Sequence, residues 1–322
     1  MTARSTARSI VSCVLLGVLG VLLAQPAFAA REPDASLLPE AMRSATYIGT
    51  AACAGCHRDI KDHFSHTAHA RRLAQSPRNE FEARNCEACH GPGSEHQTDP
   101  GAHGKIVGFD RTAGVSVQQM NGMCLQCHAA TERIHWAGSV HDVNGLACSD
   151  CHNPMAQFSA RALQRRESIS ATCFGCHQQQ RLQFQKVSHM PLPEGKITCT
   201  DCHNPHGSPT DPLLKADTVN HLCYTCHQEK RGPFLWEHAP VRENCLNCHN
   251  PHGSNHEFLL VTARPFLCQQ CHSHLRHPND LQTRAELVGG PFPDERLIGR
   301  SCQNCHSQIH GSNHPSGVRM HR

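Results

Sequence analysis

The sequence predicts an elongated chain of coil and short α-helices, with few strands, whose interior is filled by a prosthetic group bound many times. Its 322 residues include 21 Cys and 28 His, but only 38% are apolar, which is too few for an ordinary side-chain core. The 20 Pro and 23 Gly fall in stretches such as CHNP and PHGS, which interrupt helices. This composition excludes a conventional dinucleotide-binding fold, a barrel enzyme or a helix bundle.

Twenty of the cysteines form ten C-x-x-C pairs, and a histidine directly follows every pair. Cysteines at positions i and i+3 lie on one face of a helical turn, so both thiols can bond the vinyl groups along one porphyrin edge. The next histidine can then reach the iron as its proximal ligand. Zinc ribbons and disulfides need no histidine there, whereas C-x-x-C-H is the attachment motif of c-type haem. We therefore predict a multihaem cytochrome c with ten covalently bound haems.

These motifs define the predicted haem sites. The haem-bonding cysteines are Cys53, Cys56, Cys86, Cys89, Cys124, Cys127, Cys148, Cys151, Cys173, Cys176, Cys199, Cys202, Cys223, Cys226, Cys245, Cys248, Cys268, Cys271, Cys302 and Cys305. The proximal histidines are His57, His90, His128, His152, His177, His203, His227, His249, His272 and His306. No residue is assigned a catalytic role.

The motifs occur in pairs and form five dihaem repeats. The first motifs of the pairs begin at residues 53, 124, 173, 223 and 268, with spacings of 71, 49, 50 and 45 residues. Such a period predicts a stack in which each repeat contacts mainly its neighbours. Short helices should carry the motifs, and the longest are expected near residues 53–73 and 159–186. We expect an N-terminal segment at 30–52, then one half with haems 1–5 at 53–177 and another with haems 6–10 at 178–322.

Eighteen further histidines suffice to give every iron a second axial ligand. Candidates between the motifs of a pair are His69, His141, His189, His238 and His277. Candidates just downstream of the second motif are His96, His206, His252 and His310. In the second pair Met155 stands where His206 and His252 stand later, so His135 is the first choice for the tenth ligand. The alternatives are the Met155 thioether, which would raise the potential of that haem, or one of His103, His221, His256 and His314.

Two axial ligands on each iron leave no open position for a substrate. Such haems are suited to electron transfer, and the sequence therefore predicts an electron-transfer protein instead of an enzyme. Without Arg4 and Arg8 the chain has 28 basic and 27 acidic residues, a formal charge of +1. Ten haems would bring about twenty propionates, so the holoprotein is formally about −9 when ferric and about −19 when reduced. Neither value suggests a nucleic-acid partner.

The N-terminus reads as an export signal over residues 1–29. Arg4 and Arg8 precede an apolar run at residues 10–24, and Ala27-Phe28-Ala29 supplies an A-x-A cleavage site. The run is shorter than the about twenty residues that span a bilayer, which favours cleavage over anchoring. We expect a periplasmic protein, a location that suits covalent haem.

Four segments of the sequence are distinctive: CHGPGSEH at 89–96, CYTCHQEKRGPFLWEHAPVRENC at 223–245, NPHGSNH at 250–256 and CHSQIHGSNHPSG at 305–317. Together with the ten motifs, they resemble the periplasmic decahaem cytochromes of the MtrA, DmsE and PioA type. The resemblance covers almost the whole mature chain and is most specific in its C-terminal half. It implies mostly bis-histidine haems.

The resemblance also implies electron transfer across the outer membrane inside a β-barrel porin. Periplasmic or inner-membrane cytochromes would lie on one side, and an outer-surface multihaem cytochrome or reductase on the other. The extracellular acceptor or donor would be a metal oxide, dimethyl sulfoxide or Fe(II), as in anaerobic respiration or iron oxidation. The alternatives are a freely soluble periplasmic electron shuttle or store and, third, a multihaem reductase of small molecules.

Overall fold

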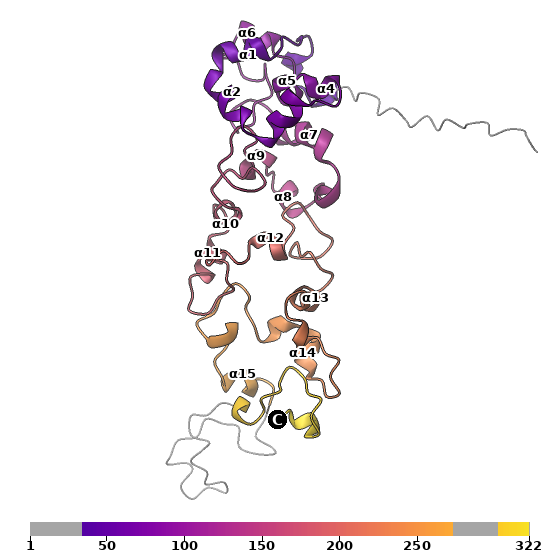
Figure 1. Ribbon diagram of the computed structural model, residues 1–322, viewed down its shortest axis with the longest axis vertical. Helices are drawn as coiled ribbons and strands as arrows, with labels where there is room; N and C mark the ends of the chain where they lie inside the picture. Colours follow the sequence, from indigo (N-terminus) through magenta and orange to yellow (C-terminus); the bar gives the residue numbers. More distant parts are fainter. Residues whose placement is uncertain (1–33, 273–301, 322) are drawn as a thin grey trace, which may run out of the picture.

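A computed structural model describes residues 34–272 and 302–321. The chain forms a slender column, in which successive segments of the sequence follow one another from α1 and α2 at one end to α15 near the other (Figure 1). This arrangement confirms the expectation of an elongated molecule of mostly coil and short α-helices. The signal segment 1–29 and His277 lie outside the described residues.

The helices are short, and most lie on or beside a C-x-x-C-H motif. The α-helices are α1 (Thr50–Cys56), α2 (Arg58–Ser65), α3 (Ala68–Ala70), α4 (Glu80–Ala83), α5 (Cys86–His90), α6 (Ser94–Thr98), α7 (Val117–His128), α8 (Val140–Val143), α9 (Cys148–Cys151), α10 (Ile169–Cys173), α11 (Gln178–Gln183), α12 (Cys199–Cys202), α13 (Val219–Tyr224), α14 (Ala239–Glu243) and α15 (Phe266–Gln269). Single turns of 3-10 helix lie at Ala35–Leu37, Glu40–Met42, Thr131–Arg133, Gln228–Lys230, Cys245–Asn247, Glu257–Leu259, Cys302–Asn304 and Gly317–Arg319, and Arg71–Gln75 is a π-helical turn.

Sheet structure in the described part of the chain is confined to isolated antiparallel bridges. Three of them recur at equivalent places in successive repeats: His152 with Gln164, His203 with Leu214, and His249 with Leu260. Each therefore fixes a proximal histidine against the chain about a dozen residues downstream. The expectation of few strands is confirmed, and the bridges act locally at the predicted haem sites.

The predicted positions of the longest helices are half right. Helical turns do cover most of 50–75, but the region 159–186 contains only the short helices α10 and α11. The longest is α7, with 12 residues, and a capping box begins it. Ser116 Oγ accepts from Gln119 N at 3.2 Å, and Gln119 Oε1 accepts from Ser116 N at 3.0 Å. The S-x-x-Q sequence at residues 116–119 is the signature of this cap.

Aliphatic packing is concentrated at the N-terminal end of the column. One buried cluster contains Met42, Val107, Val115, Met120, Met123 and Ala147, with Leu37 and Leu38 packed against it. A smaller one contains Phe64, Ala70 and Leu73, against which Cys89 and Met155 pack. Both clusters are supplied mainly by residues that precede the fourth motif. The N-terminal region therefore has a side-chain core of its own.

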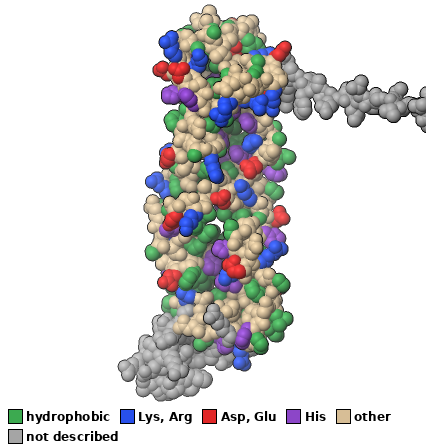
Figure 2. Space-filling view, viewed as in Figure 1, with side chains coloured by type: hydrophobic (Ala, Val, Ile, Leu, Met, Phe, Trp, Pro, Cys, Tyr) green, Lys and Arg blue, Asp and Glu red, His purple; other side chains and the backbone are tan. Residues whose placement is uncertain are grey.

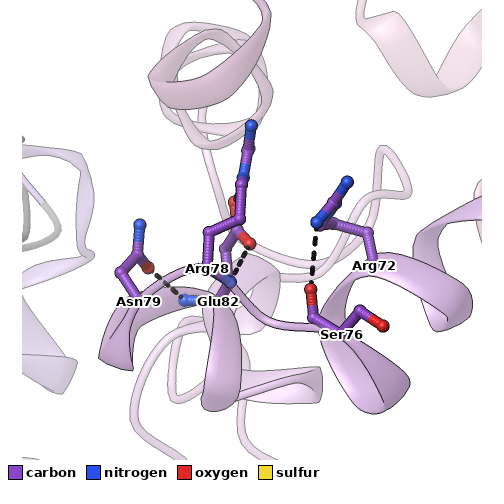
Figure 3. Close-up of polar contacts among 5 residues, drawn as sticks. All are labelled: Arg72, Ser76, Arg78, Asn79 and Glu82. Atoms are coloured by element: carbon purple, nitrogen blue, oxygen red, sulfur yellow. Dashed lines mark hydrogen bonds and ion pairs between the residues drawn. The ribbon is translucent and has the colours of Figure 1, made fainter.

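A polar turn joins the π-helical turn at Arg71–Gln75 to α4 (Figure 3). The buried carboxylate of Glu82 accepts from Arg78 Nη2 at 2.5 Å, from Arg78 Nε at 2.8 Å and from Arg78 N at 2.8 Å. The Asn79 side chain caps α4 by accepting from Glu82 N at 2.8 Å, and Arg72 donates to Ser76 O at 3.0 Å. This turn positions the chain that enters the second haem motif.

Within residues 34–272 and 302–321, every helix is too short or too polar to span a lipid bilayer.

Candidate haem-binding sites

Each C-x-x-C-H motif is folded into a single helical turn. In most motifs the amide of the histidine donates to the carbonyl of the first cysteine, as in His57 N to Cys53 O at 2.9 Å and His203 N to Cys199 O at 3.0 Å. His90 and His128 are the last residues of α5 and α7, so their motifs are helical as well. A turn of this kind presents both thiols on one side and the histidine next to them. The local geometry therefore fits covalent attachment of one porphyrin.

Asparagine side chains hold the two motifs of a pair together. Asn121, three residues before Cys124, donates from Nδ2 to Leu146 O at 2.9 Å and accepts from Cys148 N at 2.8 Å. Asn220 makes the equivalent bonds in the fourth repeat, accepting from Cys245 N at 2.8 Å and donating to Val241 O and Arg242 O at 2.9 and 3.0 Å. Both side chains are buried. We call each set of hydrogen bonds from one asparagine side chain an asparagine latch. Each latch fixes the second motif of a pair against the helix that carries the first.

The first repeat uses a buried carboxylate for the same purpose. Glu87, inside the second motif, accepts backbone N–H groups from Ile48 at 2.9 Å, Gly49 at 2.8 Å and Gly93 at 2.9 Å. Gly49 caps α1, which carries the first motif. Three N–H donors compensate the burial of this charge. The two N-terminal motifs are thereby fixed relative to each other.

The first cysteines of the two motifs in each pair are neighbours. The thiols in contact are those of Cys53 and Cys86, Cys124 and Cys148, Cys173 and Cys199, Cys223 and Cys245, and Cys268 and Cys302. Burial raises the pKa of the Cys268 thiol to about 11, and the nearby Cys302 adds to the increase. Because each thiol would mark the edge of its porphyrin, two porphyrins bound at a pair of motifs would be adjacent.

The second cysteines connect one pair with the next. The neighbouring thiols are Cys89 and Cys127, Cys151 and Cys176, Cys202 and Cys226, and Cys248 and Cys271. Burial, with a smaller contribution from Cys127, raises the pKa of Cys89 to about 11. The two sets of neighbouring thiols alternate, so each motif lies near the next from the first to the tenth along the column.

In the second motif of each pair, a hydrogen bond to a backbone carbonyl fixes the ring of the proximal histidine. The ring nitrogen Nδ1 lies 2.6–2.9 Å from the carbonyl oxygen in each case. The pairs are His90 with Val107, His152 with Ala162, His203 with Pro212, His249 with Phe258 and His306 with Arg319. When Nδ1 donates to a carbonyl, Nε2 is the nitrogen left to bind a metal. These rings are oriented as iron ligands.

Predicted proximal and distal histidines face each other across a constant gap. Their ring centroids are 6.2 Å apart in His57 with His96, 5.9 Å in His128 with His69, 6.0 Å in His152 with His206, 6.2 Å in His177 with His141, 6.2 Å in His203 with His252, 6.1 Å in His249 with His310 and 6.1 Å in His272 with His238. Histidine side chains are visible at several heights of the column (Figure 2).

This gap fits an iron atom held between two imidazoles. A metal–nitrogen bond of about 2 Å on each side leaves about 2 Å for the two ring radii. The Nδ1 atoms of His69, His96 and His206 are buried and have no hydrogen-bond partner in the structure. The residues present therefore fit haem with two histidine ligands.

Burial keeps five of the predicted distal rings neutral, which is the form that binds a metal. Loss of hydration lowers the pKa of His206 to about 4 and that of His310 to about 4. It also lowers the pKa of His69, His238 and His252. A lone pair is therefore available on each of these rings at neutral pH.

Six of the seven facing pairs join rings of neighbouring repeats, which the sequence did not reveal, whereas His57 and His96 both belong to the first repeat. His206 belongs to the third pair but faces His152 of the second, and His252 faces His203 in the same way. The between-motif ring of His141 faces His177 of the next pair. The distal rings therefore cross-link neighbouring repeats. The sequence signal for this arrangement is the regular recurrence of the distal histidines, which allows each of them to pair with a proximal histidine one repeat away.

Other candidates lie elsewhere. His135 is exposed, and its carbonyl lies close to Gly207, where the φ of 113° and the lack of a Cβ permit this approach. His189 bonds through Nδ1 to Lys186 O at 2.7 Å and through Nε2 to Glu194 at 3.1 Å. His321, which the sequence analysis did not consider, has its ring 4.5 Å from that of His306. Its position as the penultimate residue, outside every motif, gave no signal.

Comparisons with known proteins agree with this geometry. Residues 189–232 and 238–277 match the family model described as doubled CXXCH motif, and residues 86–169 match the cytochrome c-type protein NrfB-like model. The chain is also similar to the multiheme cytochrome MtrA of Shewanella baltica (strain OS185). The two are 37% identical over 327 residues, which cover 97% of this chain and 96% of that protein.

Proposed function

Because the chain belongs to the MtrA family of multihaem cytochromes, we propose that it carries electrons across the outer membrane through ten haems c arranged in one series. It is a c-type cytochrome with covalently bound haem that transfers electrons, and the number ten follows from its ten motifs. Each haem supplies a reversible one-electron change at its iron. The observation that carries the proposal is the alternating series of neighbouring thiols, since it leaves no break between the ends of the column.

Histidines are the axial ligands of most of these haems in our proposal. The pairs at about 6 Å support the distal ligands His96, His69, His206, His141, His252, His310 and His238 for haems 1, 3, 4, 5, 6, 8 and 9. His141 lies between the motifs of the second pair and faces the first proximal histidine of the third pair. By the same rule, His189 of the third pair is the proposed distal ligand of haem 7 in the fourth pair. An iron with both axial positions occupied by histidine favours outer-sphere electron transfer over reaction with a small molecule. His277 and His135 stay predictions as further ligands.

A β-barrel partner would allow such a column to cross the outer membrane. The hydrocarbon core of a bilayer is about 30 Å thick and excludes irregular backbone, whereas a closed barrel hides its contents from lipid. We propose a porin-like barrel as this partner, with a periplasmic or inner-membrane cytochrome at one end and an outer-surface multihaem cytochrome or reductase at the other. Cleavage after residue 29 and the division into halves at residue 177 stay predictions.

The second candidate is a soluble periplasmic shuttle with the same haems. A conductor and a store differ in what a single missing haem does. In a series, every electron passes each site, so loss of a central haem interrupts transfer. In a store, the remaining sites still fill and empty.

The first test is fractionation of native cells, with haem-stained gels of the membrane and periplasmic pools. A conduit remains with an outer-membrane barrel after a high-salt wash, and a shuttle leaves wholly with the soluble periplasm. Soluble release would contradict the conduit, although the haem assignments would be untouched.

The second test uses the isolated complex in vesicles that contain a trapped redox dye. Replacing Cys199 and Cys202 by Ala removes the covalent attachment of haem 6 and should stop reduction of the dye by an external donor. The control His252→Met leaves haem 6 attached and changes only its proposed distal ligand, so transfer should continue. Undiminished dye reduction in a Cys variant shown to contain nine haems would contradict a single series.

A further inference from the structure

The second motif of the first repeat stands apart from the second motifs of repeats 2, 3 and 4. His152, His203 and His249 each face a histidine of the following repeat at about 6 Å. The ring contact of His90, by contrast, is with Phe109 at 5.3 Å. Among the described ring contacts, none joins His90 to another histidine at that spacing. The question is which side chain of the second repeat occupies the equivalent place.

The turn that supplies the distal ligand is built alike in three repeats. In the third repeat Asn204 Oδ1 accepts from His206 N at 3.2 Å, and Asn204 N donates to Leu213 O at 2.8 Å. The fourth repeat has the same two bonds, at 3.2 and 2.7 Å, around Asn250 and His252. The ligand position is thus the second residue after the asparagine of an N-P-x turn.

In the second repeat this position is Met155. Asn153 Oδ1 accepts from Met155 N at 3.0 Å, and Asn153 N donates to Leu163 O at 2.7 Å. The bridge of His152 with Gln164 also matches the bridges of His203 and His249. Met155 therefore occupies the same backbone position as His206 and His252.

The packing of Met155 places it at the second haem site. The turn around His206 packs on the first-motif loop of the preceding repeat, where Gly207 approaches His135, seven residues after His128. Met155 packs on the cluster that contains Phe64, which is seven residues after His57. Cys89, the second cysteine of haem 2, packs on this same cluster. Met155 and the haem 2 motif therefore share one half-buried, apolar environment.

We propose that the Met155 thioether is the distal ligand of haem 2, opposite His90. This inference rests on the proposed decahaem series and identifies a chemically distinct member of it. The side chain is neutral and flexible and has a sulfur lone pair, so it can bind iron where histidine does in the later repeats. A methionine ligand raises the reduction potential of a haem relative to a second histidine. Haem 2 is then the site in the series that is reduced first.

The test is spectroscopy of the oxidised holoprotein. The wild type should show the long-wavelength sulfur-to-iron charge-transfer band of a His–Met haem, and Met155→Ala and Met155→His should both lose it. In potentiometric titration, the haem of highest potential should move to lower potential in Met155→His. Two control variants test whether the band is specific to a methionine at the ligand position. Met190→Leu should keep the band, and His206→Met, at the equivalent position of haem 4, should add a second one.

Several outcomes would overturn the proposal. They are absence of the band from the wild type, survival of the band in Met155→Ala, or an unchanged highest potential in Met155→His. An all bis-histidine spectrum would assign haem 2 to another histidine, such as His63, His66 or His103. A pyridine haemochrome count on the same samples tests the ten-haem proposal separately, because attachment does not depend on the distal ligand. Met155→His keeps a ligand at the site and serves if Met155→Ala is poorly folded.

Discussion

The two ends of the column are stabilised in different ways. Up to Ala147 the structure has an aliphatic cluster around Met42, Val107 and Met120, all at most 2% exposed. Beyond Ala147, the buried apolar side chains of the described residues are scattered at about one or two per repeat: Phe184, Leu192, Leu214, Leu260 and Met320. Several large apolar side chains there are exposed, and Val187 reaches 88%. Among the residues that the structure describes, a continuous core of side chains is found at the N-terminal end only.

This difference indicates what porphyrin does in each region. A chain of this length with few buried side chains cannot offset its loss of conformational entropy by apolar packing alone. In the later repeats the missing apolar contacts must come from the haems, held by helical turns and asparagine latches. At the N-terminal end haem adds to a core that already exists. Haem is therefore a structural component of the column as well as its electron carrier.

Removal of haem should produce the largest contrast. Chain exported in cells that cannot attach haem should lose hydrogen-exchange protection throughout the segment beyond Ala147, while residues 37–147 keep measurable protection. Met120→Ala in this haem-free chain should remove the remaining protection, because truncating a buried methionine costs about 2–5 kcal/mol. Equal protection along the whole chain would contradict the comparison.

Variants of the two asparagines, Asn121 and Asn220, test the comparison while the number of bound haems stays the same. Ala at Asn121 or at Asn220 leaves a buried backbone donor without a partner, at a cost of about 1–3 kcal/mol. We expect a larger decrease in Tm for Asn220→Ala, since Asn220 makes one more hydrogen bond and lacks the aliphatic cluster around α7. Thermal unfolding of the oxidised holoprotein measures both. Equal decreases for the two Ala variants would count against the idea.

The smallest expected effect is the pH dependence of the turn at Glu82. Hydrogen bonds from Arg78 hold the pKa of Glu82 below its ordinary value of 4.5. The bonds therefore stabilise the fold fully above about pH 4.5, and this stabilisation is lost as the pH falls through the lowered pKa. Glu82→Gln should decrease stability towards urea at neutral pH by less than the latch variants, because the Arg78 side chain is 65% exposed. The difference from wild type should shrink on acidification, and a difference that grows would contradict this account.

Much of the site could be predicted because its chemistry is local. A C-x-x-C-H motif folds into one helical turn whatever surrounds it, so the cysteines and proximal histidines follow from spacing alone. The between-motif histidines His69, His141 and His238 were also recognisable, since each recurs at a similar place in its repeat. The elongated form followed from the repeat period. The longest helix of the described residues, α7, lies outside the two regions where long helices are expected, and its sequence signal is the cap formed by Ser116 and Gln119.

The sequence by itself determined the motifs, the repeats and the shortage of apolar residues, because each depends on residue type and spacing along the chain. The tertiary structure decided which histidine faces which. His206 reaches His152 across a repeat boundary, and Met155 lies with the second motif of the first repeat, some 65 residues earlier in the chain. Contacts of this kind depend on how neighbouring repeats stack. The order of the series also comes from packing, since it is the alternating contacts of first and second cysteines that join the ten motifs end to end.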